Sequence, residues 1–220
     1  MNLGIITYNK KHKKTQEVLK GLIKKKKYRI TLLITKFKSF RKRETYFKHR
    51  PYQFVGLNPK QLKKKHDIKI KILNKSNLKL FDKVIICGSG LINSKMLIND
   101  KIINCHSGLI PETRGLDSLK WAIIKLKKVG NSLHYIDKNV DLGRVISHKA
   151  TKLLKKDTLK SFSDRHYNNE IKMLINFEKY LSKPQLIKLR KKKENLRMNI
   201  NIEKKIDKYF VLYKKKFLNK

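Results

Sequence analysis

The feature that most constrains the fold of this chain is a repeated alternation of short apolar runs with segments of helical periodicity. The apolar runs are residues 3–8, 29–34, 83–87 and 102–106. Apolar residues at helical spacing fill 15–24 and 116–127. Short apolar runs are typical of buried strands, and strands that alternate with helices favour a largely parallel sheet. The sequence therefore predicts an α/β domain in which helices flank a mostly parallel sheet.

Weaker signals extend this pattern between the second and fourth runs. Asn58 and Pro59 predict the start of a helix that runs to about residue 66, because Asn caps helices well and Pro suits the first turn. The isoleucines of 68–72 alternate with lysines, which indicates an edge strand or an amphipathic turn. A short helix is expected over 94–98.

The second half of the chain continues with two strands and a long helix. Residues 132–136 and 144–148 have the pattern of strands that pair with one another. Asp157 is expected to cap a helix over 158–181. The apolar stripe of that helix includes His166 and is expected to pack in the core.

Composition divides the chain into two parts. Its 220 residues suffice for one domain of ordinary size and an appendage. Residues 1–182 carry the alternating pattern and are expected to form that domain. Residues 183–220 are dense in Lys and Arg, so we expect a basic C-terminal tail that is helical or partly disordered.

The formal net charge of +41 at pH 7 raises the question of an anionic partner. Lys and Arg neutralise phosphates, which favours nucleic-acid binding as one interpretation. The basic residues are mostly Lys and are spread along the whole chain, which is also rich in Ile and Asn. AT-rich coding produces this composition by default, so we favour compositional drift over a nucleic-acid site. A positive field would also draw in a small phosphate-bearing substrate.

The two cysteines and the hydropathy pattern indicate a cytoplasmic protein. Cys87 and Cys105 each lie in an apolar strand-like run without a second Cys at metal-binding spacing, so we expect two buried, reduced thiols and no metal. No apolar run approaches the roughly 18 residues of a membrane span. The first residues, 1–7, lack the charged lead-in of a signal peptide and are expected to form a buried strand.

Chemically useful side chains cluster where predicted strands end. Asn104 and His106 are two apart on one strand, so their side chains should share a face. The segment 88–90, Gly-Ser-Gly, follows the preceding strand. Sites in parallel sheets form at the carboxyl ends of strands, so both segments point to one crevice. With Asp141 further on, an amide, an imidazole and a carboxylate would suit acyl transfer, although each residue alone is more often structural.

Short sequence motifs around these residues extend the pattern. They are Asn104-Cys105-His106, Leu109-Ile110-Pro111, Arg114-Gly115, Trp121-Ala122-Ile123, Gly130-Asn131-Ser132-Leu133-His134 and Asp141-Leu142-Gly143. In order and spacing they resemble the formyltransferase family that uses 10-formyltetrahydrofolate. That family includes glycinamide ribonucleotide transformylase, methionyl-tRNA formyltransferase and sugar N-formyltransferases. The resemblance is good over 84–148 and implies a Rossmann-like formyltransferase domain over 1–182.

The resemblance also implies roles for individual residues. The catalytic residues would be Asn104, His106 and Asp141. The residues that bind the folate would be Gly88, Ser89, Gly90, Leu91, Ile92, Asp137 and Val140. The residues that contact the amine substrate would be Ser107, Gly108, Arg114 and Glu170. Ser132 and His134 would support the catalytic residues from behind.

These implied roles make physical sense for transfer of a formyl group to an amine. Asn104 would donate a hydrogen bond to the developing oxyanion, an effect worth roughly 3–4 kcal/mol in oxyanion holes. His106 would carry protons between the amine and the folate nitrogen, which suits an imidazole. Asp141 would orient His106. The co-substrate would be 10-formyltetrahydrofolate, without a metal, and the resemblance leaves a homodimer open.

Two departures from the family pattern bear on the acceptor. Ser107-Gly108 stands where the family usually has Pro after the His. The stretch 7–12 replaces the glycine-rich phosphate loop of the purine enzyme, although Lys10 or Lys11 could act as point charges. The sequence of residues 114–121 is most similar to the corresponding segment of formyltransferases that act on nucleotide-linked amino sugars.

The sequence therefore leaves four functions in order of preference. The first is N-formylation of a nucleotide-linked amino sugar, and the second is the glycinamide ribonucleotide reaction of purine biosynthesis. The third is methionyl-tRNA formyltransferase, which the short basic tail disfavours because that family adds a β-barrel domain. The fourth is an RNA-binding relative that has lost activity, which the presence of Asn104, His106 and Asp141 disfavours.

Overall fold

A seven-stranded sheet forms the centre of the protein, with strand order β3-β2-β1-β4-β5-β6-β7. The computed structural model describes all residues except 38–43, 139–142, 183–192 and 219–220. The strands are β1 (Asn2–Tyr8), β2 (Arg29–Thr35), β3 (Lys69–Ile72), β4 (Lys83–Ile86), β5 (Ile102–His106), β6 (Gly130–Tyr135) and β7 (Val145–Ala150). β1 to β5 pair in parallel, whereas β6 and β7 run antiparallel to their neighbours. The predicted α/β fold with a mostly parallel sheet is confirmed.

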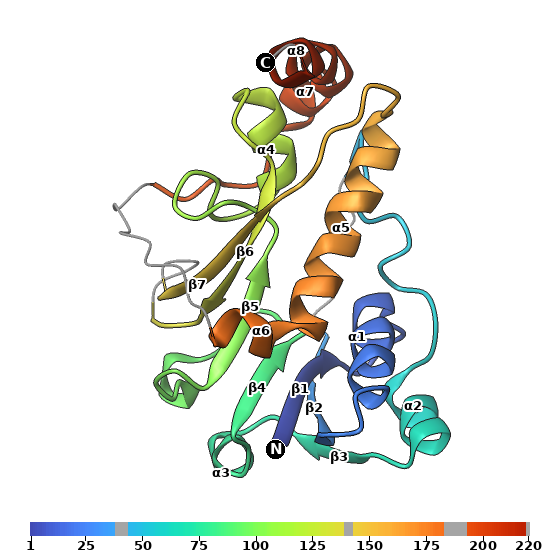
Figure 1. The fold of residues 1–220 in the computed structure, drawn as a ribbon, viewed down its shortest axis with the longest axis vertical. Coiled ribbons are helices and arrows are strands. Elements are labelled where there is room, and N and C mark those ends of the chain that lie inside the picture. Colours follow the sequence, from blue (N-terminus) through green and yellow to red (C-terminus); the bar gives the residue numbers. More distant parts are fainter. Residues whose placement is uncertain (38–43, 139–142, 183–192, 219–220) are drawn as a thin grey trace.

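Helices cover both faces of this sheet (Figure 1). They are α1 (Lys13–Ile23), α2 (Pro59–His66), α3 (Lys75–Lys79), the 3₁₀ helix η1 (Ser94–Met96), α4 (Ser118–Ile124), α5 (Leu159–Ile175), α6 (Phe177–Leu181), α7 (Ile200–Glu203) and α8 (Ile206–Leu218). α1 and α5 pack side by side on one face of the sheet. α8 packs on α4 at one end of the molecule, beside the short α7.

The apolar core lies in two layers on either side of the sheet and in a third cluster at the α4 end. One layer joins alternate residues of the strands, such as Ile5 and Ile103, to α1 and α5. The opposite layer contains Ile6 and Ile102. Adjacent strand residues thus enter different layers, as the period of two requires. The parallel strands are buried on both faces, which explains their continuous apolar sequences.

Local sequence signals predicted most helix boundaries to within two residues of their positions in the structure. The side chain of Asn58 accepts from the backbone N–H of Gln61, and the side chain of Gln61 accepts from the backbone N–H of Asn58. The predicted cap is therefore confirmed, and it forms a capping box. The edge strand predicted over 68–72 is present as β3. The strands predicted over 132–136 and 144–148 are present as β6 and β7, and they pair.

Three predictions about helices were wrong in detail. The residue that caps α5 is Thr158 rather than Asp157, whose carboxylate instead receives Arg165. The helix predicted over 158–181 ends at Ile175, because Asn176 leaves the helical conformation before α6 begins. The helix predicted over 116–127 spans only α4, and α3 was not predicted at all.

Residues 200–218 of the C-terminal tail are mostly helical and pack on the domain. Ile206, Phe210 and Tyr213 of α8 are at most 5% exposed and belong to the apolar cluster around α4. The Glu203 carboxylate is buried and receives both Lys120 of α4 and the backbone N–H of Phe47. A division of the chain at residue 182 remains a prediction.

Candidate active site

β5 places the side chains of Asn104 and His106 on one face of the sheet. Between them, Cys105 points to the opposite face, where its Sγ atom lies 3.9 Å from Sδ of Met173 on α5. Asn104 and His106 make their contacts away from α5, with β6 and with the loop that follows β5. The strand therefore delivers an amide and an imidazole to one side of the sheet, at its carboxyl end.

The imidazole of His106 is held through its Nε2 atom. This nitrogen lies 2.9 Å from the backbone oxygen of Thr113 and 3.0 Å from Oγ of Ser118. The Ser118 hydroxyl donates its own hydrogen to the carbonyl of Gly115 at 2.7 Å. A carbonyl oxygen only accepts, so Nε2 of His106 must carry a hydrogen. In the neutral ring the lone pair is then on Nδ1, which becomes the nitrogen that can take up a proton.

His134 holds the amide of Asn104 in a similar way. Nδ1 of His134 lies 3.0 Å from the backbone oxygen of its neighbour Tyr135, so Nδ1 is the donor and Nε2 the acceptor. Nδ2 of Asn104 lies 3.3 Å from this Nε2 atom and donates to it. His134 therefore accepts one N–H of Asn104, and this hydrogen bond sets the orientation of the Asn104 amide.

Ser132 fixes the loop that leaves β5. Its hydroxyl donates to the backbone oxygen of Gly108 at 2.7 Å and accepts from the N–H of Ile110 at 3.0 Å. A Cβ atom on Gly108 would lie 2.1 Å from the backbone oxygen of Thr113, so the loop closes this tightly only with glycine. The close approach to Thr113 therefore explains why residue 108 is a glycine.

The segment after β4 lies beside the end of β5 and is open on one side. Gly88 is buried against the rings of Tyr8 and His12, and the Tyr8 hydroxyl donates to the Ser89 carbonyl at 2.7 Å. No atom lies within 4 Å of a Cβ placed on Gly90, and Leu91 is 88% exposed. This stretch thus offers accessible backbone and an exposed apolar side chain, and the folate-binding roles predicted for 88–91 stay predictions.

The structure separates the remaining predicted site residues. Ile92 packs on the core layer of α3, and Asp137 is exposed after β6. Arg114 lies on the loop before α4, 3.7 Å from the Glu194 carboxylate. Asp141 and Val140 lie outside the described residues, so their predicted roles stay predictions.

Glu170 lies on α5, across the sheet from Asn104 and His106, in a buried ion cluster. Its carboxylate is 2.7 Å from Nζ of Lys14 and also receives Arg50. Burial opposes ionisation, but the charges of Arg50 and Lys14 outweigh it and lower the pKa of Glu170 to about 2. No local sequence pattern indicates Lys14 or Arg50, because their partner is distant along the chain.

His166 lies on α5, about one turn before Glu170. It is buried, and Nδ1 lies 2.8 Å from Oγ1 of Thr151. Burial lowers the pKa of His166 to about 4, while Glu170 and the Ser107 backbone oppose that shift. The predicted core position is correct, but its polar surroundings were not foreseen from the apolar stripe.

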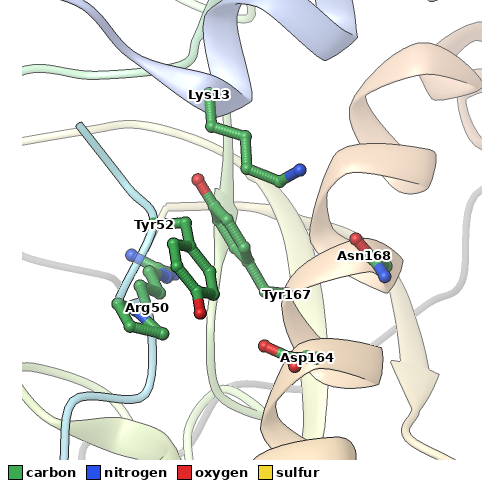
Figure 2. Close-up of a pocket in the computed structure, with 7 residues that line it drawn as sticks. Lys13, Arg50, Tyr52, Asp164, Tyr167 and Asn168 are labelled. Atoms are coloured by element: carbon green, nitrogen blue, oxygen red, sulfur yellow. The ribbon is translucent and has the colours of Figure 1, made fainter. Parts of the chain in front are cut away.

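A pocket with a cavity volume of about 230 Å³ opens beside the ion cluster. Figure 2 shows Lys13 of α1, Arg50 and Tyr52 of the segment before α2, and Tyr167 of α5 gathered around it. The backbone N–H of Lys13 donates to the Gln53 carbonyl at 3.0 Å. The first N–H of α1 is therefore already engaged by the chain itself.

The described residues contain no cluster of His, Cys, Asp or Glu that could hold a metal ion. Cys87 and Cys105 are both buried and free, as predicted. Burial raises the pKa of the Cys87 thiol to about 12 and raises that of Cys105 as well, which makes both thiols poor nucleophiles. Within the described part of the chain, no helix is long and apolar enough to span a membrane.

Comparison with solved structures shows the same fold in several formyltransferases. Phosphoribosylglycinamide formyltransferase from Anaplasma phagocytophilum matches with a TM-score of 0.61 at 17% identity, over 84% of this chain and 89% of that one. A sugar N-formyltransferase from Shewanella matches with a TM-score of 0.57 at 18% identity, over 91% and 77%. The formyltransferase PseJ from Anoxybacillus kamchatkensis, solved with a formamido sugar nucleotide and tetrahydrofolate, matches with a TM-score of 0.53 at 15% identity, over 100% and 90%.

Sequence comparison supplies the family. Among curated proteins, no relative matches the chain. The family model described as formyl transferase matches residues 5–177, which include part of β1, all of β2 to β7 and α5. The chain therefore belongs to the formyl transferase family.

Proposed function

We propose that this protein transfers a formyl group from 10-formyltetrahydrofolate to the amine of a small phosphate-bearing substrate, with a nucleotide-linked amino sugar as the favoured acceptor. The observation that carries the proposal is the shared face of Asn104 and His106 at the end of β5, each oriented by a separate hydrogen bond. The family to which the chain belongs uses formyl-tetrahydrofolate as donor.

The two side chains supply complementary parts of the reaction. The co-substrate supplies the formyl group. Asn104 donates a hydrogen bond to the oxygen on which negative charge develops as the amine attacks. His106 accepts the proton of the attacking amine at Nδ1, because Nε2 already carries a hydrogen toward Thr113. The imidazolium then returns that proton to the departing nitrogen, and Asp141 steadies the charged ring.

The pocket beside α5 supports an anionic acceptor. Lys13 and Arg50 line it together with the rings of Tyr52 and Tyr167. Cationic side chains suit phosphate oxygens, and aromatic rings suit the flat base of a nucleotide. Arg50 of the pocket pairs with Glu170 of α5, about one turn along the helix from the buried His166.

The start of α1 favours an amino-sugar nucleotide over glycinamide ribonucleotide. Helix N-termini bind phosphate through unengaged N–H groups, and glycine-rich loops bring phosphate to them. Here residues 7–12 form no such loop, and the Lys13 N–H already donates to Gln53. Glycinamide ribonucleotide remains the second candidate, because phosphoribosylglycinamide formyltransferases share the fold. A transfer RNA acceptor and a non-catalytic RNA-binding role rest on the net charge of +41 alone.

The decisive experiment is a substrate screen with 10-formyltetrahydrofolate that follows release of tetrahydrofolate. Amino-sugar nucleotides, glycinamide ribonucleotide and methionyl-tRNA are supplied in turn to the wild type and to His106→Ala. We expect release with an amino-sugar nucleotide and a loss of at least about 100-fold in His106→Ala. No release with any amine would refute the enzyme, and a clear preference for glycinamide ribonucleotide would reverse our order of acceptors.

A second measurement tests the pocket. Lys13→Ala should raise KM for the phosphate-bearing amine by about tenfold and leave KM for the folate unchanged, since a charge-assisted bond is worth about 1.5–3 kcal/mol. Lys20→Ala, at an exposed position on the same helix, is the matched control. Equal KM values in both variants would show that the acceptor binds elsewhere.

A further inference from the structure

We propose that residues 194–198, in the C-terminal tail, position the imidazole of His106, with Asn195 as the positioning residue. This inference rests on the proposed catalytic role of His106. Residues 194–198 lie after the part of the chain, 5–177, that matches the family model. The proposed positioning contacts therefore come from a segment outside the part that matches the family model.

Two groups that hold His106 lie at the two ends of one short loop. Thr113 supplies a backbone oxygen at 2.9 Å from Nε2, and Ser118 supplies Oγ at 3.0 Å. The residues between them, 114–117, have no strand partner within the main sheet. Ser132 and Leu109 hold the loop on the Thr113 side, so on the Ser118 side the position of the imidazole depends on whatever fixes 114–117.

Asn195 fixes this loop with hydrogen bonds from its backbone and its side chain. Its N–H donates to the Arg114 carbonyl at 2.9 Å, and its carbonyl accepts from the Leu116 N–H at 2.8 Å. Its side-chain Nδ2 donates to the same Arg114 carbonyl at 2.9 Å. The pairing forms an isolated parallel bridge between Gly115 and Asn195. One residue of the tail therefore holds the main chain on both sides of Gly115.

Neighbouring residues of the tail extend this clamp to α4. The indole Nε1 of Trp121 donates to the Leu196 carbonyl at 2.8 Å. The Met198 N–H donates to the Asp117 carboxylate at 3.0 Å, directly before α4. Nζ of Lys125 donates to Oδ1 of Asn195 at 2.6 Å. Side chains from α4 and backbone from the loop thus converge on the same five-residue stretch, 194–198.

Gly115 shows that the close approach of the tail needs a particular residue in the loop. Its φ of +89° lies in the left-handed region that favours glycine. A Cβ at this position would lie 2.4 Å from the backbone oxygen of Asn195 and 2.8 Å from its nitrogen. Any side chain at residue 115 would push the tail away from the loop.

The consequence for His106 follows from the geometry of its hydrogen bonds. If 114–117 moves, the Ser118 hydroxyl moves with it, and Nε2 loses one of its two fixed acceptors. The hydrogen of the neutral ring is then held less firmly at Nε2, and Nδ1 ceases to be the dedicated proton acceptor. Misplacement of a catalytic group by about 1 Å can cost about 100-fold in rate.

The test compares Asn195→Asp, Gly115→Ala and the control Leu196→Ala in the full-length protein. Asn195→Asp keeps the size of the side chain and an acceptor for Lys125, but it replaces the donor to Arg114 with an oxygen. Gly115→Ala inserts the Cβ described above. Leu196 is 67% exposed, so its truncation leaves the backbone bond to Trp121 in place. Thermal melts establish that each variant is folded.

Two readouts separate this proposal from the proposed function. Nitrogen chemical shifts of the His106 ring, assigned with His106→Gln, report which nitrogen carries the hydrogen, whether or not an acceptor amine is known. We expect the Nε2–H form in the wild type and in Leu196→Ala, and a mixture of forms in Asn195→Asp. With an amine that is a substrate, kcat should fall about tenfold in Asn195→Asp while KM for the folate stays within twofold.

Several outcomes would overturn the proposal. Ring shifts of His106 in folded Asn195→Asp that match the wild type would show that the tail does not position the imidazole. Altered ring shifts with unchanged kcat would retain the positioning but refute the catalytic role of His106. If Gly115→Ala fails to fold, Asn195→Asp alone decides, because it adds no atom to the close contact.

Discussion

Nε2 of His106 donates to the backbone carbonyl of Thr113 across 2.9 Å, although the two residues are only seven apart along the chain. The loop after β5 folds back on the strand that it leaves, and Gly108 makes this possible because it has no Cβ to meet Thr113. Gly108, in the segment where the chain departs from the family pattern, thus allows the Thr113 carbonyl to lie beside the proposed catalytic ring.

Ser118→Ala should lower kcat by about three- to tenfold without unfolding the protein. The variant removes one of the two atoms that hold Nε2 of His106, and a neutral hydrogen bond is worth about 0.5–1.5 kcal/mol. Steady-state kinetics with the acceptor found in the screen measures this. Ser94→Ala, in η1, serves as the control and should retain the wild-type kcat.

His134→Leu should reduce kcat about tenfold, because Asn104 loses the acceptor that orients its amide. His134→Gln retains a side-chain acceptor and should recover a large part of the rate. The comparison separates orientation from bulk, since both variants fill the buried site. Equal kcat in the two variants would show that the bond from Asn104 to His134 does not matter for turnover.

Glu170→Gln should lower the free energy of unfolding by about 3–5 kcal/mol, since it leaves two cations beside a neutral amide in the interior. Glu178→Gln is the matched control on α6. Its carboxylate pairs with Lys27 near the surface, where the side chains are 31% and 54% exposed, so the loss should stay below about 1 kcal/mol. Urea unfolding at pH 7 measures both values. Similar losses would contradict the buried ion cluster.

Stability should fall as the pH drops below about 6.5, because His166 and His12 are buried in neutral form. Burial lowers the pKa of His166 to about 4 and that of His12 to about 3 from an ordinary value of 6.5. Between pH 6.5 and these values the unfolded chain binds more protons than the native protein. Stability is therefore greatest above pH 6.5 and declines by up to about 1.4 kcal/mol per pH unit for each histidine.

A second loss should follow at lower pH. The pKa of Glu170 is lowered to about 2 from 4.5, so its contribution is present above pH 4.5 and is lost as the pH falls toward 2. Denaturant unfolding between pH 7 and 4 measures the first phase. His166→Gln should flatten it, whereas His66→Gln, at a partly exposed position, should follow the wild type. A flat wild-type profile from pH 7 to 4 would contradict the neutral buried histidines.

Strands were predicted well because the signal is local. The run 102–106 gave β5 with the same bounds, since buried parallel strands are continuously apolar. Helix ends were predicted less well. Thr158 rather than Asp157 caps α5, because either residue type can cap and the choice depends on how the chain enters the helix. The five-residue α3 has too short a pattern for periodicity to detect.

The sequence by itself determined the α/β fold, the shared face of Asn104 and His106, and the family resemblance that residues 5–177 confirm. Each of these depends on neighbours along the chain or on ordered motifs. Only the tertiary structure decided that Glu170 is enclosed by Lys14 and Arg50, and that Asn195 holds the loop around His106. Such contacts join residues 80 or more positions apart. The packing of α5 and of the tail creates them, and no local pattern records that packing.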